Sequence, residues 1–251
     1  LRSFPNLPAA DVPVGRDASE NVLLREVGQK PVFDFTPKNY LMIGEAMDII
    51  DVKTAAKVAG SRFGYLKGLG ATLELALVNF AVNRLAPKGF TLVFPPVMIK
   101  PKVFAGMGRL SPDQIEERYY LPKDDLYLVG SAEHSLGPMH MDEVLRAEDL
   151  PKRYLGFSTC FRREAGSYGQ DTKGIMRVHQ FDKVEMFSFA KPEHSDEEQK
   201  FLLSCQEELM KELALPYRVM QICTGDLGWT DARQFDIETW LPSEKKYRET
   251  H

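Results

Sequence analysis

The chain has 251 residues, of which 43% are hydrophobic and 27% are charged. This length and composition can bury one large core or two smaller ones, and they exclude a chain that is disordered throughout. Lysine and arginine number 32 against 36 aspartate and glutamate residues, so the formal charge is −4. The chain therefore lacks the overall basic charge that an autonomous nucleic-acid-binding domain usually carries.

The sequence shows neither a membrane span nor a secretory signal. No segment approaches the roughly 18 consecutive apolar residues of a membrane-spanning helix. The cysteines, Cys160, Cys205 and Cys223, lie far apart and form no Cys-x-x-Cys pair. Isolated cysteines of this kind suit a reducing compartment, so we expect a cytoplasmic protein without membrane contact.

The first part of the chain is punctuated by prolines, which fix their own backbone and restrict the residue before them. Because prolines recur along residues 1–38, we interpret this segment as an extended lead-in rather than a packed element. Residues 39–59 have the pattern of a helix, and residues 62–66 have that of a short strand.

Two longer helices are predicted from the spacing of their apolar residues. Over residues 71–86 the apolar side chains recur at i, i+3, i+4, i+7 and i+8, as in a helix with one buried face. Residues 90–94 follow as a strand. The second helix spans about 196–214, and Ser195 with Glu198 has the pattern of a capping box at its start.

The remaining predicted strands follow one another through loops and hairpins more often than through helical crossovers. This order favours an α+β fold, with helices flanking an antiparallel β-sheet, over a doubly wound parallel sheet. The predicted strands cover residues 126–130, 154–164, 181–190, 217–224 and 233–240.

The strand over residues 154–164 is predicted to have two unlike faces, because side chains alternate along a strand. Leu155, Phe157 and Phe161 lie on one face. The other face carries small side chains and then charges, which leaves room for a ligand, although a solvated strand end with an ion pair explains the same pattern. That face comprises Gly156, Ser158, Cys160, Arg162 and Glu164.

The strand over residues 181–190 places Phe181, Lys183 and Glu185 on one face. A ring and a carboxylate on one face suit a ligand with a planar end and a cationic end. On spacing alone, a core phenylalanine and a paired glutamate are the favoured explanation. The polar segment 165–174 between the two strands is either a ligand-binding loop or lid, or an ordinary hairpin loop.

Several other kinds of site have no signature in the sequence. The phosphate-binding loop, the dinucleotide fingerprint, the His-Glu-x-x-His zinc motif and the Gly-x-Ser-x-Gly elbow are all missing. We interpret His134, His140 and His194 as surface or helix-end residues without a functional role.

Two segments together resemble motif 2 of the seryl-tRNA synthetase family, which belongs to the class II aminoacyl-tRNA synthetases. They are residues 161–167 (FRREAGS) and 177–185 (RVHQFDKVE). Residues 131–133 (SAE) resemble the Thr-Ala-Glu segment that binds serine in this family. Residues 79–96 resemble motif 1, the helix and strand of class II dimers. The resemblance extends over essentially the whole chain, through residues 6–28, 223–228, 234–240 and 247–250.

The resemblance implies a class II synthetase-like fold, an antiparallel β-sheet flanked by helices, in a cytoplasmic homodimer. It also implies a serine–tRNA ligase, which uses ATP to activate L-serine to seryl-adenylate and transfers the seryl group to tRNA(Ser). The implied small-molecule partners are L-serine and ATP, with Mg²⁺ as the cofactor.

The same resemblance implies a role for each matching residue. Arg162 and Glu185 are the implied catalytic residues, because a guanidinium fork can hold the serine carboxylate and the α-phosphate together. Glu249 is the implied Mg²⁺ ligand. The implied serine-binding residues are Ser131, Ala132, Glu133, Arg162 and Glu185. The implied ATP-binding residues are Arg162, Arg163, Glu164, Arg177, Val178, Phe181 and Glu249.

Some features depart from the family pattern. Ser131 stands where the family usually has threonine, so the hydroxyl is kept and a methyl group is lost. We expect residues 1–38 to be a linker from a missing N-terminal arm that carries tRNA recognition. We expect residues 39–251 to be a catalytic core that ends before motif 3. Such a piece is expected to activate serine poorly by itself and to leave most tRNA contacts to the arm.

Two alternatives remain open at this point. One is a synthetase-like ligase that charges a carrier protein, but such relatives use a zinc ion in the amino-acid site, and no convincing zinc ligand set is visible. The other is a non-catalytic paralogue that binds nucleotide, which would suit the absence of motif 3. The joint presence of the motif 2 residues favours the serine–tRNA ligase.

Overall fold

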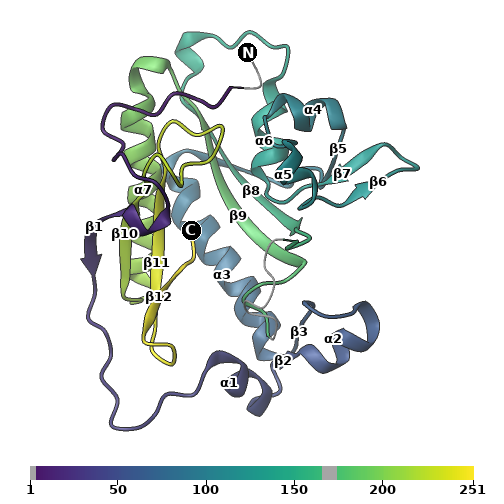
Figure 1. Cartoon of the computed structure of the whole chain (residues 1–251), viewed down its shortest axis with the longest axis vertical. Helices are drawn as coiled ribbons and strands as arrows, with labels where there is room; N and C mark the ends of the chain where they lie inside the picture. The colour runs from purple at the N-terminus through teal and green to yellow at the C-terminus, as the bar shows by residue number, and fades with distance from the viewer. Residues whose placement is uncertain (1–3, 166–173) are drawn as a thin grey trace. The chain divides into compact units, whose positions relative to one another are not determined.

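The computed structural model describes residues 4–165 and 174–251 (Figure 1). These residues form two compact units. Unit 1 contains the described residues up to Asn39 together with Gln199–His251, and unit 2 is Tyr40–Glu198. Each unit is considered by itself below.

The α-helices of the described residues are α1 (Tyr40–Ala46), α2 (Val52–Ala59), α3 (Leu69–Leu85), α4 (Pro101–Gly106), α5 (Pro112–Ile115), α6 (Glu133–Leu136) and α7 (Ser195–Glu212). The short 3-10 helices are η1 (Ala18–Glu20), η2 (Ala86–Lys88), η3 (Gly137–His140), η4 (Ala147–Asp149) and η5 (Pro192–His194). The strands are β1 (Val22–Val27), β2 (Ile50–Asp51), β3 (Tyr65–Leu66), β4 (Phe90–Val93), β5 (Met98–Ile99), β6 (Tyr120–Leu121), β7 (Leu126–Leu128), β8 (Lys152–Phe161), β9 (Gln180–Phe189), β10 (Tyr217–Gln221), β11 (Phe235–Leu241) and β12 (Lys246–Glu249).

The predicted α+β class is confirmed, because helices accompany sheets in which nearly all strand pairs are antiparallel. Unit 1 holds the antiparallel sheet β1-β10-β11-β12. Unit 2 holds the sheet β4-β8-β9 and two smaller sheets, β2-β3 and β5-β7-β6. The pairing of β4 with β8 is parallel and is the departure from the expected antiparallel order in the described sheets.

The N-terminal lead-in is more structured than the sequence predicted. Residues 22–27 form β1, which pairs with β10, so the prediction of an unpacked lead-in is wrong here. The six residues contain no proline, and their backbone groups are therefore free to pair with a neighbouring strand. Val12 is also buried. The division into a linker (1–38) and a core (39–251) stays a prediction.

The helix predicted over residues 39–59 is two helices, α1 and α2. Asp48 takes a left-handed backbone conformation, with φ of 54°, which no helix can continue through. The short strand β2 follows and pairs with β3, and Asp51 then caps α2 by accepting a hydrogen bond from the Thr54 backbone N–H at 2.8 Å. Turn chemistry at two aspartates thus overrides the helical pattern.

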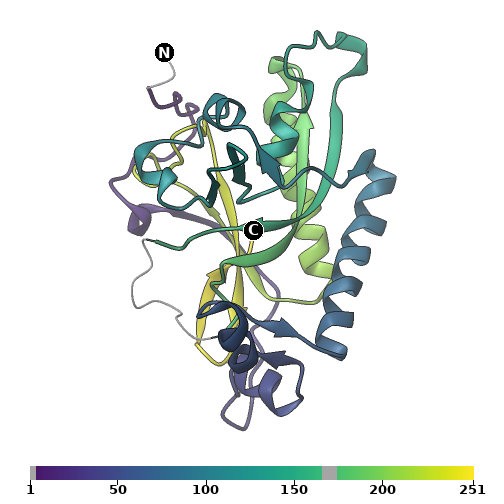
Figure 2. The same cartoon turned by 90° about the vertical axis from the view of Figure 1, so that its right-hand side faces the viewer.

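Helix α3 confirms the predicted helix over residues 71–86, and it ends through η2 at Gly89, which adopts φ of 90°. The predicted apolar face is not buried, however, because Leu73 and Leu77 are 58% and 42% exposed. In unit 2, α3 runs alongside the β4-β8-β9 sheet (Figures 1 and 2). Strands β8 and β9 are ten residues long each and pair along their full length. They therefore provide the longest rigid support in the unit.

Helix α7 confirms the prediction for residues 196–214, but its capping box is wrong. The Ser195 hydroxyl donates to the Pro192 carbonyl at 2.9 Å. The Glu198 carboxylate instead accepts from Arg153 at 2.6 and 2.8 Å and from the Ser188 hydroxyl at 2.7 Å. The Glu198 side chain is 10% exposed, and a charge at this depth needs a guanidinium partner more than a helix start needs a cap.

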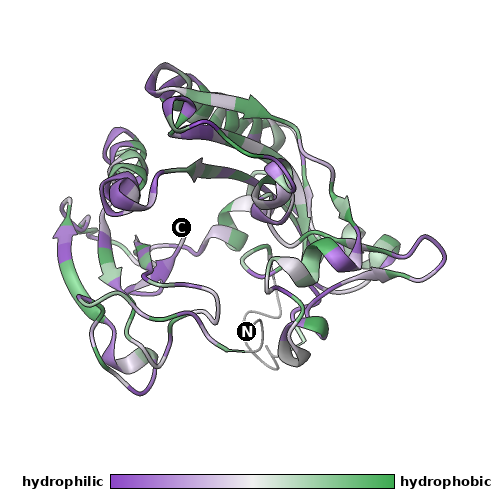
Figure 3. Ribbon diagram, turned by 90° about the horizontal axis from the view of Figure 1, so that it is seen from above, coloured by the Kyte–Doolittle hydropathy of each residue, from purple (hydrophilic) through white to green (hydrophobic). Residues whose placement is uncertain are grey.

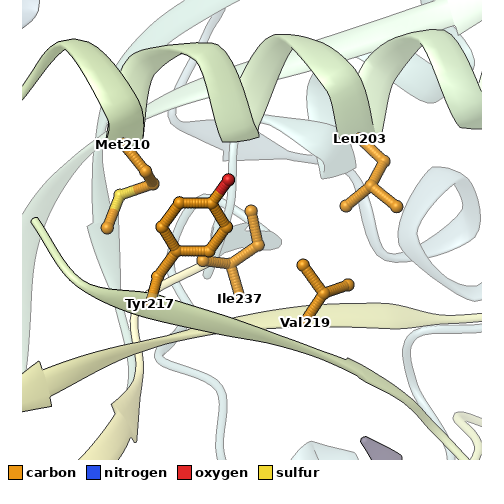
Figure 4. Packing of buried hydrophobic residues seen from close by; sticks show 5 residues of the cluster. All are labelled: Leu203, Met210, Tyr217, Val219 and Ile237. Carbon is orange, nitrogen blue, oxygen red and sulfur yellow. The ribbon is translucent and has the colours of Figure 1, made fainter. Parts of the chain in front are cut away.

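The core of unit 1 forms where α7 covers β10 and β11 (Figure 4). Leu203 and Met210 from the helix face Tyr217, Val219 and Ile237 from the strands. The buried Tyr217 hydroxyl donates to Glu207 at 2.9 Å, and Arg25 of β1 donates to the same carboxylate at 2.5 and 3.0 Å. This pairing satisfies the polar groups that the packing removes from water.

Hydrophobic and hydrophilic residues are mixed along the helices (Figure 3). In the part of the chain that the structure describes, no helix is both long enough and apolar enough to cross a membrane.

Candidate active site

The two polar strand faces predicted from the sequence meet in the β8–β9 pair of unit 2. Gly156 lies opposite Glu185, Ser158 opposite Lys183, and Cys160 opposite Phe181. Directly opposed residues point to the same face of a sheet, so the small residues of β8 and the charged residues of β9 share one face. The polar faces are therefore combined into one surface.

The small side chains of β8 do not leave open space, as the sequence suggested they would. Ser158 is 6% exposed and Cys160 is 0% exposed. The space over Gly156 is filled by Leu136 and Ala132, since an added Cβ would lie 2.8 and 3.1 Å from atoms of those side chains. Because the side chains on this face of β8 are small, residues 131–136, which include α6, pack directly against the sheet.

This seating brings Ser131 against the β9 charges. Its hydroxyl donates to a Glu185 carboxylate oxygen at 2.7 Å and accepts from the Lys183 ammonium at 3.1 Å. Lys183 also forms an ion pair with Glu185. The predicted serine-binding residues Ser131 and Glu185 are therefore in contact, and together they present acceptor oxygens that hold a primary ammonium group.

Glu133 and Ala132 complete the same segment. The Glu133 backbone N–H donates to the Ser131 hydroxyl at 3.2 Å, and its carboxylate accepts from Arg109 at 2.6 Å. Ala132 is 0% exposed and packs toward the sheet. Arg109 was not predicted from the sequence, because it lies 24 residues from its partner and belongs to no motif.

Arg162 follows the last residue of β8 and is held on both sides. Its Nε donates to the Gly130 carbonyl at 3.1 Å, and its guanidinium carbon lies 5.1 Å from the centre of the Phe181 ring. Its backbone N–H donates to the His179 carbonyl at 3.0 Å. The terminal nitrogens are not used by these contacts, so they are the part of the fork available to an oxyanion.

The site holds more cationic than anionic groups. Arg118 packs over the Phe104 ring at 5.3 Å. Burial lowers the pKa of Arg118, and the neighbouring Arg162 and Arg109 lower it further. These three guanidinium groups and Lys183 stand near three carboxylates, Glu117, Glu133 and Glu185. The surplus of positive charge favours an anionic ligand.

Glu164 and Arg177, both predicted on the ATP side, form an ion pair at 3.1 Å. Strand β8 ends at Phe161, and Glu164 adopts a left-handed backbone with φ of 54°, so the alternation predicted up to residue 164 is wrong at its end. Such a conformation in a non-glycine residue is a strained one that surrounding structure must hold. The direction of the Glu164 carboxylate is therefore set by the backbone that follows β8 and not by the strand itself.

Two other residues predicted to bind ATP, Arg163 and Val178, are sequence neighbours of Glu164 and Arg177. The Arg163 guanidinium stands over the Tyr119 ring at 5.7 Å, and the Arg163 backbone N–H donates to the Glu117 backbone carbonyl at 3.0 Å. Val178 is half-buried. The loop predicted as a ligand-binding loop or lid is residues 165–174, and residues 166–173 of it lie outside the described residues.

His134 was predicted to be a surface or helix-end residue; it lies at the end of the short helix α6, but it is not on the surface. It is 4% exposed and its ring packs on Phe104 at 4.7 Å. Burial lowers its pKa to about 3, and the nearby cations Arg118, Arg109, Arg162 and Lys183 act in the same direction. The ring is therefore neutral at physiological pH.

Glu249, the predicted Mg²⁺ ligand, belongs to unit 1. It is exposed on β12, opposite Glu238 of β11. Burial raises the pKa of Asp236 to about 6, and repulsion from Glu249, Asp226 and Glu238 adds to this. No group of three or more metal-binding side chains gathers among the residues described here. The Mg²⁺ role of Glu249 stays a prediction.

Comparison with known proteins identifies relatives over nearly all of this chain. Residues 117–251 match the family model described as "tRNA synthetase class II core domain (G, H, P, S and T)". A protein of Thermobifida fusca named serine–tRNA ligase is 50% identical over 249 residues, which is 99% of this chain and 58% of that protein.

Solved structures agree with this match. The crystal structure of seryl-tRNA synthetase from Pyrococcus horikoshii, complexed with ATP, has a TM-score of 0.95 and 42% identity over 99% of this chain and 60% of that one. A cytoplasmic serine–tRNA ligase from Naegleria fowleri, in complex with AMP, has a TM-score of 0.92 and 30% identity over 98% of this chain and 54% of that one. The chain thus spans somewhat more than half the length of the relatives it matches.

Proposed function

The chain belongs to the family of class II tRNA synthetase core domains, and from this premise we propose that its protein is a serine–tRNA ligase. The protein activates L-serine with ATP to seryl-adenylate and then transfers the seryl group to tRNA(Ser). The names of the relatives and their structures with ATP and AMP support this proposal.

The observation that carries the proposal is the ammonium held by Ser131 and Glu185. Lys183 places its ammonium between the Ser131 hydroxyl and the Glu185 carboxylate. A free amino acid brings an ammonium group of the same chemistry, and charge-assisted hydrogen bonds to such acceptors are the stronger kind. We therefore assign these two residues to the α-ammonium of serine, with Lys183 as its stand-in.

The first reaction step requires two anions to meet. A carboxylate oxygen of serine attacks the α-phosphorus of ATP, the bond to the bridging oxygen of the β-phosphate breaks, and pyrophosphate leaves. The terminal nitrogens of Arg162 suit both oxyanions, because a preorganised guanidinium neutralises charge as it develops. Arg109 and Arg118 add to the positive potential, and Glu133, held by Arg109, borders the amino acid.

The remaining predicted residues are proposed to bind the nucleotide. Glu164 accepts from the adenine amino group, and the Phe181 ring stacks on the base. Arg163, Arg177 and Val178 border the nucleotide on the same side. Glu249 of unit 1 is proposed as a Mg²⁺ ligand, an ion that would neutralise negative charge on phosphate oxygens.

We further propose a homodimer formed through α3. Leu69, Leu73 and Leu77 recur at every fourth residue along this helix and are 69%, 58% and 42% exposed. An apolar stripe of this kind on a helix surface is typical of an interface. Serine, ATP and tRNA meet where proteins are made, so we propose a cytoplasmic enzyme, with most tRNA contacts outside the described residues.

The alternatives are less well supported. The curated relatives are named serine–tRNA ligases, and they do not favour a ligase for carrier proteins. A non-catalytic paralogue would not need Ser131, Glu185 and Arg162 to keep the geometry described above.

The test is serine-dependent ATP–pyrophosphate exchange by the complete product of the gene that encodes this chain. Exchange with serine, and far less with alanine or threonine at equal concentration, is the expected result. Absence of exchange with every amino acid would refute the enzyme, and exchange with a different amino acid would refute the substrate.

A further inference from the structure

A chain of hydrogen bonds links the buried His134 to Arg162. The Gly130 backbone N–H donates to His134 Nδ1 at 3.1 Å. The carbonyl of the same Gly130 accepts from Arg162 Nε at 3.1 Å. Both bonds are made by one residue, so the histidine and the guanidinium are joined through a single short piece of backbone.

The surroundings leave this backbone little freedom. An added Cβ on Gly130 would lie 2.4 Å from a terminal nitrogen of Arg118, so a larger residue here would require that guanidinium to move. Phe104 is 0% exposed, and its ring contacts both the His134 ring at 4.7 Å and the Arg118 guanidinium at 5.3 Å. The backbone from Gly130 to Ser131 is therefore enclosed by packed side chains.

We propose that His134 is a positioning residue for the activation reaction, and that it orients Arg162 through the Gly130 backbone. The inference rests on the proposed function, because Arg162 is assigned there to the serine carboxylate and the α-phosphate. It goes beyond it, because His134 touches neither substrate and matches none of the motif residues. Its role depends on one ring nitrogen, Nδ1, acting as an acceptor.

The requirement for an acceptor explains why the ring must be neutral with its proton on Nε2. A protonated ring would carry a hydrogen on Nδ1 and would oppose the Gly130 N–H. It would also place a fifth positive charge beside those of Arg109, Arg118, Arg162 and Lys183. The neighbouring cations thus favour the same form of the ring that the hydrogen bond requires.

Two amide substitutions at His134 distinguish the role of Nδ1 from that of Nε2. In His134→Asn the side-chain oxygen can take the place of Nδ1, whereas in His134→Gln the oxygen falls near the place of Nε2. Both variants are polar and uncharged, so they remove the ring equally. We expect His134→Gln to lower kcat for pyrophosphate exchange about tenfold, as expected when a buried amide loses its acceptor, and His134→Asn to stay within about threefold of wild type.

The coupling to Arg162 is tested in a second background. Lysine has no Nε donor at the guanidinium position, so His134→Gln should change kcat by less than about twofold when Arg162→Lys is already present. His140→Gln is the matched control. That ring also makes two hydrogen bonds, donating from Nδ1 to the Glu143 carboxylate at 2.6 Å and accepting at Nε2 from the Tyr154 hydroxyl at 2.8 Å, but it lies outside the site. We expect it to affect thermal stability and not kcat.

The outcomes are decisive in both directions. Equal kcat for His134→Asn and His134→Gln, or an equal loss with and without Arg162→Lys, would overturn the proposal. The histidine tautomer can be read in the wild-type protein by nitrogen NMR, without any variant, and a proton on Nδ1 at neutral pH would also overturn it. Absence of exchange in the wild type, by contrast, would refute the proposed function itself.

Discussion

The burial of His134 predicts an acid sensitivity that can be measured apart from any activity. The pKa of this ring is lowered from 6.5 to about 3 in the folded protein. Between these values the unfolded chain binds a proton that the folded one does not bind, so stability falls as the pH falls. Replacing the ring by the uncharged amide of His134→Asn removes this one contribution and keeps the acceptor for Gly130.

The expected size follows from the difference in proton binding. Where only the unfolded ring is protonated, each pH unit of acidification lowers the free energy of unfolding by about 1.4 kcal/mol. Between pH 8 and pH 5 the ring in the unfolded chain goes from nearly neutral to nearly fully protonated. The wild-type protein should therefore lose about 2 kcal/mol of unfolding free energy over this range through His134 alone. The variant should lose less than wild type by the same amount.

The assay is urea-induced unfolding at a series of pH values, with the free energy of unfolding compared between the two proteins at each pH. The exposed His194, which lies 3.0 Å from Glu197, provides the matched control. His194→Asn should track the wild-type curve within about 0.5 kcal/mol. Parallel curves for wild type and His134→Asn would show that His134 is solvated or charged in the fold and would refute the reasoning.

Three further predictions concern the proposed site and interface. Arg162→Ala should cost about 3 kcal/mol or more in kcat/KM for pyrophosphate exchange, because a preorganised charge is lost from the transition state, and near-normal exchange would contradict its role. Glu185→Gln should raise KM for serine about 10- to 100-fold, since a charged acceptor of the ammonium is lost, and an equal rise in KM for ATP would argue against this assignment. Leu73→Glu should convert a dimer into a monomer at micromolar concentration in sedimentation, whereas a variant that remains dimeric would place the interface elsewhere.

Strand pairs and long helices were predictable because their signals lie within short stretches of sequence. The alternation along residues 154–164 and 181–190 predicted a polar face on each strand, and the observed register of β8 and β9 shows that these faces coincide. Helix α3 likewise follows from its apolar spacing. Where the prediction was wrong, a single turn decided the outcome, at Asp48 between α1 and α2 and at Glu164 beyond β8.

The contents of the site were less accessible to prediction. Arg109, Arg118 and His134 belong to no recognised sequence motif. Their place in the site follows from contacts with residues distant in the chain. Arg109 meets Glu133 across 24 positions, and Ser131 meets Glu185 across 54. The small face of β8 was predicted to leave room for a ligand, but Leu136 fills the space over Gly156.

The sequence by itself determined the fold class, the family resemblance and the identity of the motif residues, because backbone periodicity and motif chemistry are properties of neighbouring residues. Only the tertiary structure decided which charged groups form ion pairs and which side chains are buried. It also decided which backbone carbonyls accept hydrogen bonds from Arg162. Those properties depend on desolvation and on distances between elements far apart in the chain, and neither can be read from local spacing. The neutral, buried His134 is the clearest case, since the sequence suggested a surface histidine and its neighbours make it part of the site.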